Sequence, residues 1–164
     1  MKLCFPPLDF YDRRIRSHIP LFIASVYHPV EKVEHANFTD TLSSIMTSVP
    51  KSAEFIGGHD VNANLGVCNN MYRKTLGPWG IYNRNMKGRR LLGFFSQHIL
   101  KVTNSFYNKP SFVTWRSFGI SKSPHMLDVI SVSETFFKCM RSCGVSPRGM
   151  RSDHSAVSLE FMNC

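Results

Sequence analysis

The sequence has 164 residues, of which 43% are apolar, and this is enough to bury the core of one domain. Lys and Arg number 20 against 11 Asp and Glu, and the net charge of +9 favours a polyanionic partner. The longest apolar stretch, residues 21–27, is far shorter than the ~20 residues of a membrane span, and no signal peptide is recognisable. We therefore expect no membrane partner.

The cysteines are odd in number and scattered, without the paired CxxC clusters of a structural zinc site. They are Cys4, Cys68, Cys139, Cys143 and Cys164. This pattern predicts reduced thiols in an intracellular protein. The four-residue spacing of Cys139 and Cys143 allows them to share one helix face, and the alternative interpretation is two inert, half-buried thiols.

The first half of the chain predicts strands that alternate with a helix. Residues 2–5 are strand-like, and residues 21–27 predict a buried central strand, apolar on both faces and closed by Pro29. Apolar residues at helical spacing predict an amphipathic helix over 33–49, which Pro50 ends. Residues 53–58 then predict a short strand that delivers the following residues at a strand end, where ligand sites are favoured.

The second half predicts one more helix and a set of strands. A loop rich in Gly, Asn and Pro over residues 64–86 leads into an amphipathic helix over 87–99. The remaining strands are predicted at 102–104, 112–115, 127–132 and 156–161. Strands separated by two helices and then by loops predict an α/β sandwich, with helices covering packed sheets, in a single domain over 1–164.

Three acidic signatures stand at or beside these strand ends: Gly-His-Asp60-Val-Asn62, Leu-Asp128-Val-Ile and Ser-Asp153-His154-Ser. Each alone is typical of a turn or cap residue. The chain has only 11 acidic residues, and together the signatures place three of them in apolar surroundings. An Asp at 128 inside an apolar strand needs a partner, because an unpaired buried charge costs several kcal/mol. His154 is a candidate, since an Asp fixes the tautomer of an imidazole.

The order of these motifs resembles the endonuclease/exonuclease/phosphatase superfamily, and the closest likeness is to the endonuclease domains of non-LTR retrotransposons. The resemblance runs over about residues 21–161. Besides the acidic signatures it includes Gly77-Pro78-Trp79-Gly80, Arg84-Asn85-Met86-Lys87-Gly88-Arg89-Arg90-Leu91-Leu92 and Thr114-Trp115-Arg116-Ser117. The ordered set is far more specific than any one member.

The resemblance implies a four-layer α/β sandwich and Mg²⁺- or Mn²⁺-dependent hydrolysis of DNA phosphodiester bonds, with DNA as partner and no obligate protein partner. It implies that Asp60 orients or deprotonates the attacking water. Asn62, on the same side of one extended segment, would bind the scissile phosphate. Asp153 would help to hold the metal, and His154, oriented by Asp128, would stabilise the pentacoordinate phosphorus. The further phosphate contacts that the resemblance implies are Tyr27 and Arg116.

The opening strands of the family carry an Asn and then a metal-binding Glu, and neither motif is present in this sequence. We therefore expect a partial sandwich that lacks its first strands and corresponds to the C-terminal two-thirds of the domain. The alternatives to a nicking endonuclease are an inactive relic that binds nucleic acid non-specifically and a phosphatase of the same superfamily acting on small phosphoesters.

Several other residues have simpler structural interpretations. We expect Arg84 and Asn85 to cap the second helix rather than to contact DNA. Trp115 is interpreted as a core or rim aromatic rather than a base-stacking platform. Several histidines lack metal-ligand spacing and are predicted to lie at the surface: His28, His35, His98 and His125.

Overall fold

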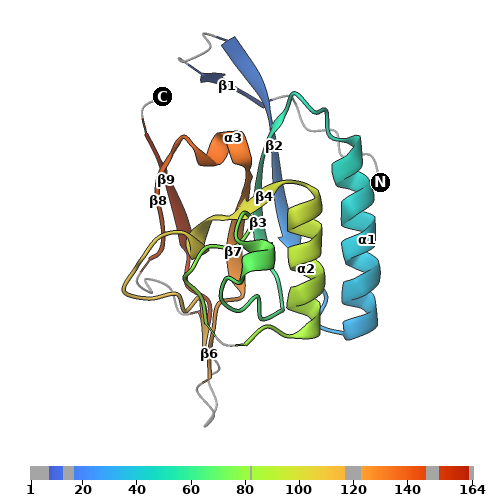
Figure 1. Ribbon diagram of the computed structural model, residues 1–164, viewed down its shortest axis with the longest axis vertical. Coiled ribbons are helices and arrows are strands. Elements are labelled where there is room, and N and C mark those ends of the chain that lie inside the picture. Colours follow the sequence, from blue (N-terminus) through green and yellow to red (C-terminus); the bar gives the residue numbers. More distant parts are fainter. Residues whose placement is uncertain (1–7, 13–16, 82, 117–122, 147–151, 163–164) are drawn as a thin grey trace.

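The computed structural model describes residues 8–12, 17–81, 83–116, 123–146 and 152–162. The strand predicted at residues 2–5 and Ser117 of the Thr-Trp-Arg-Ser motif lie outside these residues. In the described part of the chain, two long α-helices lie on one side of a mixed sheet, and a small antiparallel sheet with a short helix lies on the other (Figure 1). None of the helices described is long and apolar enough to cross a lipid bilayer.

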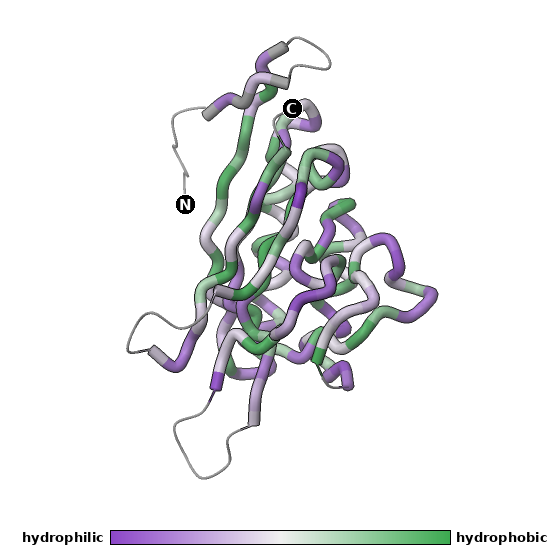
Figure 2. The backbone as a smooth tube through the Cα atoms, turned by 90° about the vertical axis from the view of Figure 1, so that its left-hand side faces the viewer, coloured by the Kyte–Doolittle hydropathy of each residue, from purple (hydrophilic) through white to green (hydrophobic). Residues whose placement is uncertain are grey.

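A five-stranded sheet forms the centre of the molecule. In spatial order its strands are β1 (Leu8–Asp12), β2 (Ser17–Tyr27), β3 (Glu54–Asp60), β7 (Asp128–Ser133) and β4 (Leu100–Val102). β2 and β3 run parallel, joined by a helical crossover, and β7 is antiparallel to β3. Figure 2, turned by 90°, shows the hydrophobic segments of this sheet side by side.

Two helices cover one face of the sheet. In α1 (Lys32–Ser48) the buried positions His35, Thr39, Leu42 and Met46 recur at helical spacing, and the helix ends two residues before Pro50. α2 (Met86–Gln97) begins at the capping side chain of Asn85, which accepts a hydrogen bond from the Gly88 amide at 2.8 Å. The buried side chains of α2 join those of the sheet in the larger of two hydrophobic cores: Leu91, Leu92, Phe94 and Phe95.

The opposite face of the sheet carries a second, smaller core. There β8 (Met140–Val145) pairs antiparallel with β9 (Val157–Phe161), and the short helix α3 (Glu134–Phe137) closes one end. Val132, Phe136, Met140 and Cys143 are its buried members. The described residues thus provide three of the four layers expected of the sandwich: helices, a central sheet and part of a second sheet.

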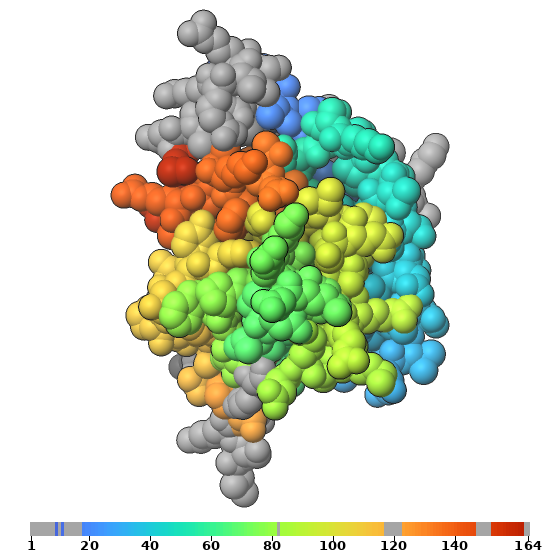
Figure 3. Space-filling model, viewed as in Figure 1, coloured from blue at the N-terminus to red at the C-terminus, as the bar shows by residue number. Residues whose placement is uncertain are grey.

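The loop between β3 and α2 packs against the rest of the molecule and covers one of its faces (green in Figure 3). Leu65 and Leu76 are almost fully buried, and the loop includes a short 3-10 helix, Asn70–Tyr72. A Cβ at Gly77 would overlap the backbone carbonyl of Ser105, so the Gly-Pro-Trp-Gly motif permits a close approach of two chain segments.

The mixed α/β fold and both helices agree with the prediction, but several details differ. β2 pairs with β1 over residues 17–21, and among the described strands residues 22–27 pair with β3 alone, so this strand is not central along its whole length. The prediction that both faces of this strand are buried is wrong: Ile23 is 45% exposed and Tyr27 64%. Residues 103–105 form a 3-10 helix after β4 rather than a strand, and the strand predicted at 112–115 is displaced to β5 (Trp115–Arg116), which pairs with β6 (Pro124–His125). Cys143 lies in β8, so Cys139 and Cys143 do not share a helix face, and both thiols are buried more fully than the half-buried position of the alternative interpretation.

Candidate active site

Three of the predicted site residues form a row across neighbouring strands. The strand register places Tyr27 of β2 opposite Asp60 of β3, and Asp60 opposite Asp128 of β7. Directly paired residues point to the same face of a sheet, and here that face is the one opposite the helices. The row therefore brings a phenol and two carboxylates together at one end of the central sheet.

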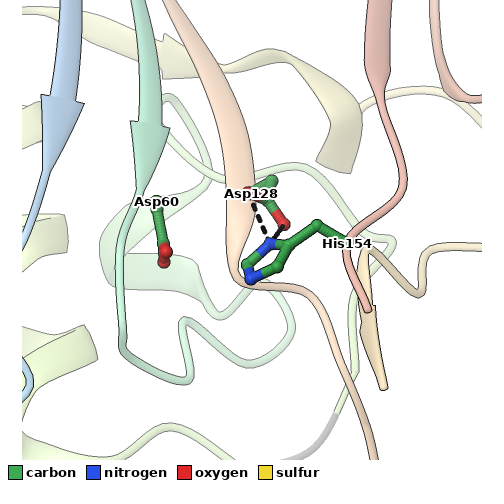
Figure 4. Close-up of side chains that lie close together, drawn as sticks. All are labelled: Asp60, Asp128 and His154. Carbon is green, nitrogen blue, oxygen red and sulfur yellow. Dashed lines mark hydrogen bonds and ion pairs between the residues drawn. The ribbon is translucent and has the colours of Figure 1, made fainter. Parts of the chain in front are cut away.

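His154 completes this arrangement from the segment that precedes β9. Its Nδ1 lies 2.9 and 3.1 Å from the two carboxylate oxygens of Asp128 (Figure 4). The two side chains are partly exposed, 34% for His154 and 25% for Asp128, so the pair is accessible from solvent. With Nδ1 facing the carboxylate, the second ring nitrogen, Nε2, is the one left for a substrate. The contact expected between Asp128 and His154 is thus present.

Thr114 holds the segments of Asp128 and His154 together. Its hydroxyl accepts hydrogen bonds from the backbone amides of Leu127 and Asp128 at 2.9 and 2.8 Å, and its carbonyl accepts one from the Ser155 amide at 2.7 Å. The Thr114 side chain is fully buried. The sequence interpretation did not assign this threonine a role, although it begins the Thr-Trp-Arg-Ser motif.

Asp60 lies in an environment that disfavours its charge. Burial raises its pKa above the usual range, and the negative charge of Asp128 raises it further. The Asn62 amide, 3.2 Å from the Asp60 Oδ1, and the positive charge of Lys87 act in the opposite direction. Lys87 is a second residue that the sequence interpretation missed as part of the site, because its helix position predicts only a solvated face.

A divalent cation fits the donor atoms at this site. One donor atom each from Asp60, Asp128 and His154 lie within 4.8 Å of one another. Like charges placed opposite each other on neighbouring strands are destabilising, and a cation relieves that repulsion. Two carboxylates suit Mg²⁺ or Mn²⁺, and an imidazole is also accepted by Mn²⁺.

Asp153, the predicted metal ligand, is not part of that group of converging donor atoms among the described residues. Its Oδ2 accepts a hydrogen bond from the Trp115 indole at 2.9 Å. The Trp115 side chain is partly buried, as expected for a rim aromatic, and its contact with Asp153 was not predicted. The metal-binding role of Asp153 stays a prediction.

Asn62 and Arg116 lie near the row of Tyr27, Asp60 and Asp128, but their side chains have other surroundings. Asn62 has a positive φ of 41°, so the prediction that it shares one extended segment with Asp60 is wrong: the strand ends at Asp60 and the backbone turns. The side-chain Nδ2 of Asn62 donates a hydrogen bond to the His28 carbonyl at 2.8 Å. Arg116 lines a neighbouring cavity, while Tyr27, Asp60 and Asp128 line an open groove of about 400 Å³.

Below the row, on the helix side of the sheet, lies a cluster of buried imidazoles. His28 and His35 are fully buried, so their predicted surface position is wrong, and His59 is 4% exposed. The His59 Nε2 lies 2.8 Å from the Ser131 hydroxyl, and its Nδ1 lies 3.4 Å from His28. Burial lowers the pKa of both His28 and His59 to about 3, so these rings are neutral near pH 7.

The Arg-Asn-x-x-Gly motif has a structural role. The guanidinium of Arg84 donates to the carbonyls of Leu65 and Val67 at 2.8 and 2.9 Å, and Asn85 caps α2. The expected capping role of Asn85 is confirmed. The capping role predicted for Arg84 is wrong, because its guanidinium binds carbonyl groups of the preceding loop.

Comparisons with known proteins agree with this fold. The profile of the family described as "Endonuclease-reverse transcriptase" matches residues 21–158. The structure is similar to the endonuclease domain of TRAS1, a telomere-specific non-LTR retrotransposon: the TM-score is 0.62 at 18% identity, over 93% of this chain and 61% of that one. Comparison with curated protein sequences gives no match.

Two further structures are similar to this chain. The 3'-5' exonuclease NExo from Neisseria meningitidis has a TM-score of 0.59 at 16% identity, over 77% of this chain and 53% of that one. The APE2 catalytic domain from Xenopus laevis has a TM-score of 0.61 at 14% identity, over 95% and 55%. The chain thus spans a little over half the length of these structures, and at such identities the likeness establishes the fold.

Proposed function

Because the chain belongs to the endonuclease–reverse transcriptase family, we propose that it is a metal-dependent phosphodiesterase that nicks DNA. The observation that carries this proposal is the convergence of Asp60, Asp128 and His154 at one end of the sheet. Such a site combines a base, an oriented imidazole and donor atoms for a cation, which are the groups that phosphodiester hydrolysis requires. The net charge of +9 favours a polyanionic substrate.

In the proposed mechanism Asp60 takes a proton from the attacking water, for which its raised pKa makes it a stronger base than an ordinary carboxylate. The water oxygen forms the new P–O bond as the bond to the leaving strand oxygen breaks, and that oxygen takes a proton from solvent. Asp128 accepts a hydrogen bond from the Nδ1–H of His154, and the opposite nitrogen, Nε2, donates a hydrogen bond to a phosphate oxygen. Negative charge grows on that oxygen in the transition state, so this contact strengthens as the reaction proceeds. Bound Mg²⁺ or Mn²⁺ would neutralise part of the same charge.

The remaining predicted residues have supporting roles. Tyr27, 64% exposed at the end of β2, would contact the phosphate with its hydroxyl, together with Asn62. Asp153 would help to hold the cation beside these groups. The motif order and the similarity to the TRAS1 domain support our proposal that the domain is of non-LTR retrotransposon origin and acts on DNA inside the cell.

A plasmid-nicking assay tests the function. Supercoiled plasmid is incubated with the wild type, Asp60→Ala, His154→Ala and the control Asp40→Ala, with Mg²⁺ or with a chelator. Asp40 lies on α1, on the side of the sheet opposite the site, is 68% exposed and pairs with Arg90. We expect nicking by the wild type and by Asp40→Ala in Mg²⁺ alone. Equal nicking by all four proteins, or nicking that survives the chelator, would contradict the proposal.

The same samples separate the inactive-relic alternative. A relic would bind DNA in a salt-sensitive way and leave the plasmid supercoiled under every condition. A phosphatase would release inorganic phosphate from small phosphomonoesters and leave the plasmid supercoiled as well.

A further inference from the structure

A second cavity, of about 360 Å³, lies beside the candidate active site. The described residues that give it a polar lining are two cations, Lys109 and Arg116, and three hydroxyl side chains, Ser111, Ser146 and Ser155. No carboxylate is among the described residues that line it. Cations and hydroxyl donors without an acid are the chemistry of an anion site, and phosphate oxygens accept from both kinds of group.

The cavity adjoins the catalytic groove. Ser155 lines both, and it directly follows His154 in the chain. The Ser155 amide donates to the Thr114 carbonyl, and the Arg116 amide donates to the Asp153 carbonyl at 3.0 Å. The wall between the two hollows is therefore the segment that also positions His154.

Lys109 is held in place by packing rather than by an ion pair. Its side chain lies over Gly144 of β8, where an added Cβ would come within 3.5 Å of the Lys109 Cδ and Cε atoms. Within the described residues Lys109 has no carboxylate partner. The aliphatic stem is thus buried against the sheet while the ammonium group is available to an anion at the cavity.

We infer that this cavity binds the phosphodiester next to the one that is cut, with Lys109 and Arg116 contacting its oxygens. The inference rests on the proposed function and narrows its substrate class to a polynucleotide. A phosphoester with only one phosphate fills one of the two sites. Two adjoining phosphate sites match the repeated phosphates of a nucleic-acid strand.

Binding measurements in chelator, where the proposed cutting cannot occur, test this inference. A fluorescent duplex oligonucleotide of mixed sequence is titrated with the wild type, Lys109→Met, Lys109→Arg and Lys51→Met, and anisotropy is read over a range of salt concentrations. Lys51 is an exposed lysine just before β3, at the end of the strand opposite Asp60, so its replacement removes the same charge elsewhere. Circular dichroism verifies that each variant is folded.

We expect Lys109→Met to raise Kd roughly fivefold and to lower the slope of log Kd against log salt by about 1, as for one lost phosphate contact. Lys109→Arg should retain most of the affinity, and Lys51→Met should change Kd by less than about twofold. Equal effects of Lys109→Met and Lys51→Met would overturn the inference.

Competition distinguishes a strand phosphate from a free phosphate. Inorganic phosphate and a dinucleotide with one phosphodiester are each used to displace the labelled duplex. Suppose that inorganic phosphate or the dinucleotide displaces the labelled duplex from the wild type at concentrations comparable to unlabelled duplex, but does not displace it from Lys109→Met. The cavity is then a small-anion site and the inference fails. A Lys109 effect on binding without any plasmid nicking would refute the proposed function alone, whereas nicking without a Lys109 effect would refute this site alone.

Discussion

The Nδ1 atom of His154 lies between the two carboxylate oxygens of Asp128, at 2.9 and 3.1 Å, although 26 residues separate them in the chain. The contact turns Nε2 away from the Asp128 carboxylate (Figure 4), and it provides a partner for a carboxylate embedded in a sheet. Asp128 also stands opposite Asp60 in the register of β3 and β7. Asp128 thus pairs with the imidazole of His154 and stands beside the carboxylate of Asp60.

Replacing Asp128 by Asn tests the orienting role. An Asn is similar in size but cannot accept the Nδ1 proton as an anion, so we expect plasmid nicking to fall by about 10²-fold or more while the fold is retained. The double variant Asp128→Asn/His154→Ala should be no slower than His154→Ala, because the two residues act as a unit. Fully additive losses would argue against that coupling.

Thr114→Val should misplace the pair and reduce stability. Valine keeps the size of the side chain but removes the oxygen that accepts from two backbone amides, and each buried unsatisfied amide costs about 1–3 kcal/mol. Urea denaturation measures the loss of unfolding free energy. Thr114→Ser keeps the oxygen and serves as the control, so an equal loss in both variants would point to packing instead.

Lys87→Met should move the pH dependence of activity. The positive charge of Lys87 lowers the pKa of Asp60, so its removal raises that pKa further. Asp60 is then protonated at a higher pH, and the acidic limb of the nicking profile should shift toward higher pH. Carbon-detected NMR of the Asp60 carboxyl gives the same shift independently of activity. Lys87→Arg, which keeps the charge, should leave both curves in place.

The buried imidazoles predict sensitivity to acid. His28 and His59 have a folded pKa of about 3 against an ordinary value of 6.5, so between these values the unfolded chain binds more protons than the folded one. Their stabilising effect is complete above pH 6.5 and is lost as the pH falls toward 3, by up to about 1.4 kcal/mol per pH unit for each residue. Urea melts at several pH values measure this slope.

Replacing His59 tests whether this residue causes the pH dependence of the unfolding free energy. His59→Gln preserves a polar partner for Ser131 without a titrating ring, so its unfolding free energy should fall less steeply with acid than that of the wild type. Gln97→Ala changes an exposed side chain that has no ionisable group, and it should retain the wild-type slope. Identical slopes in all three proteins would remove the buried histidines as the cause.

Two glycines of α2 should respond in opposite ways to alanine. At Gly88 a Cβ would overlap the backbone carbonyl of Asn64, whereas at Gly93 it would meet no atom within 4 Å. Gly88→Ala should therefore lower the unfolding free energy by about 2 kcal/mol or more, through overpacking against a rigid backbone. Gly93→Ala should raise it by about 0.5–1 kcal/mol, the helix propensity difference. Thermal and urea melts of the two variants decide between these outcomes.

The sequence by itself determined those features that depend on local patterns. Apolar spacing and Pro50 define α1, the cap at Asn85 defines the start of α2, and apolar runs define β3, β7 and β9. Burial of an unpaired charge is unfavourable, and this was enough to predict a partner for Asp128. Only a few titratable residues stand next to a predicted strand, and His154 is one of them.

Only the tertiary structure decided the features that depend on pairing between distant segments. The register of three strands aligns Tyr27, Asp60 and Asp128, and a shift of one residue would turn a carboxylate to the other face. Burial of His28 and His35 follows from the packing of α1 on the sheet, and β8 has no alternation that would reveal it in the sequence. Register and burial arise from contacts across the whole chain, so local residue patterns contain too little information to predict them.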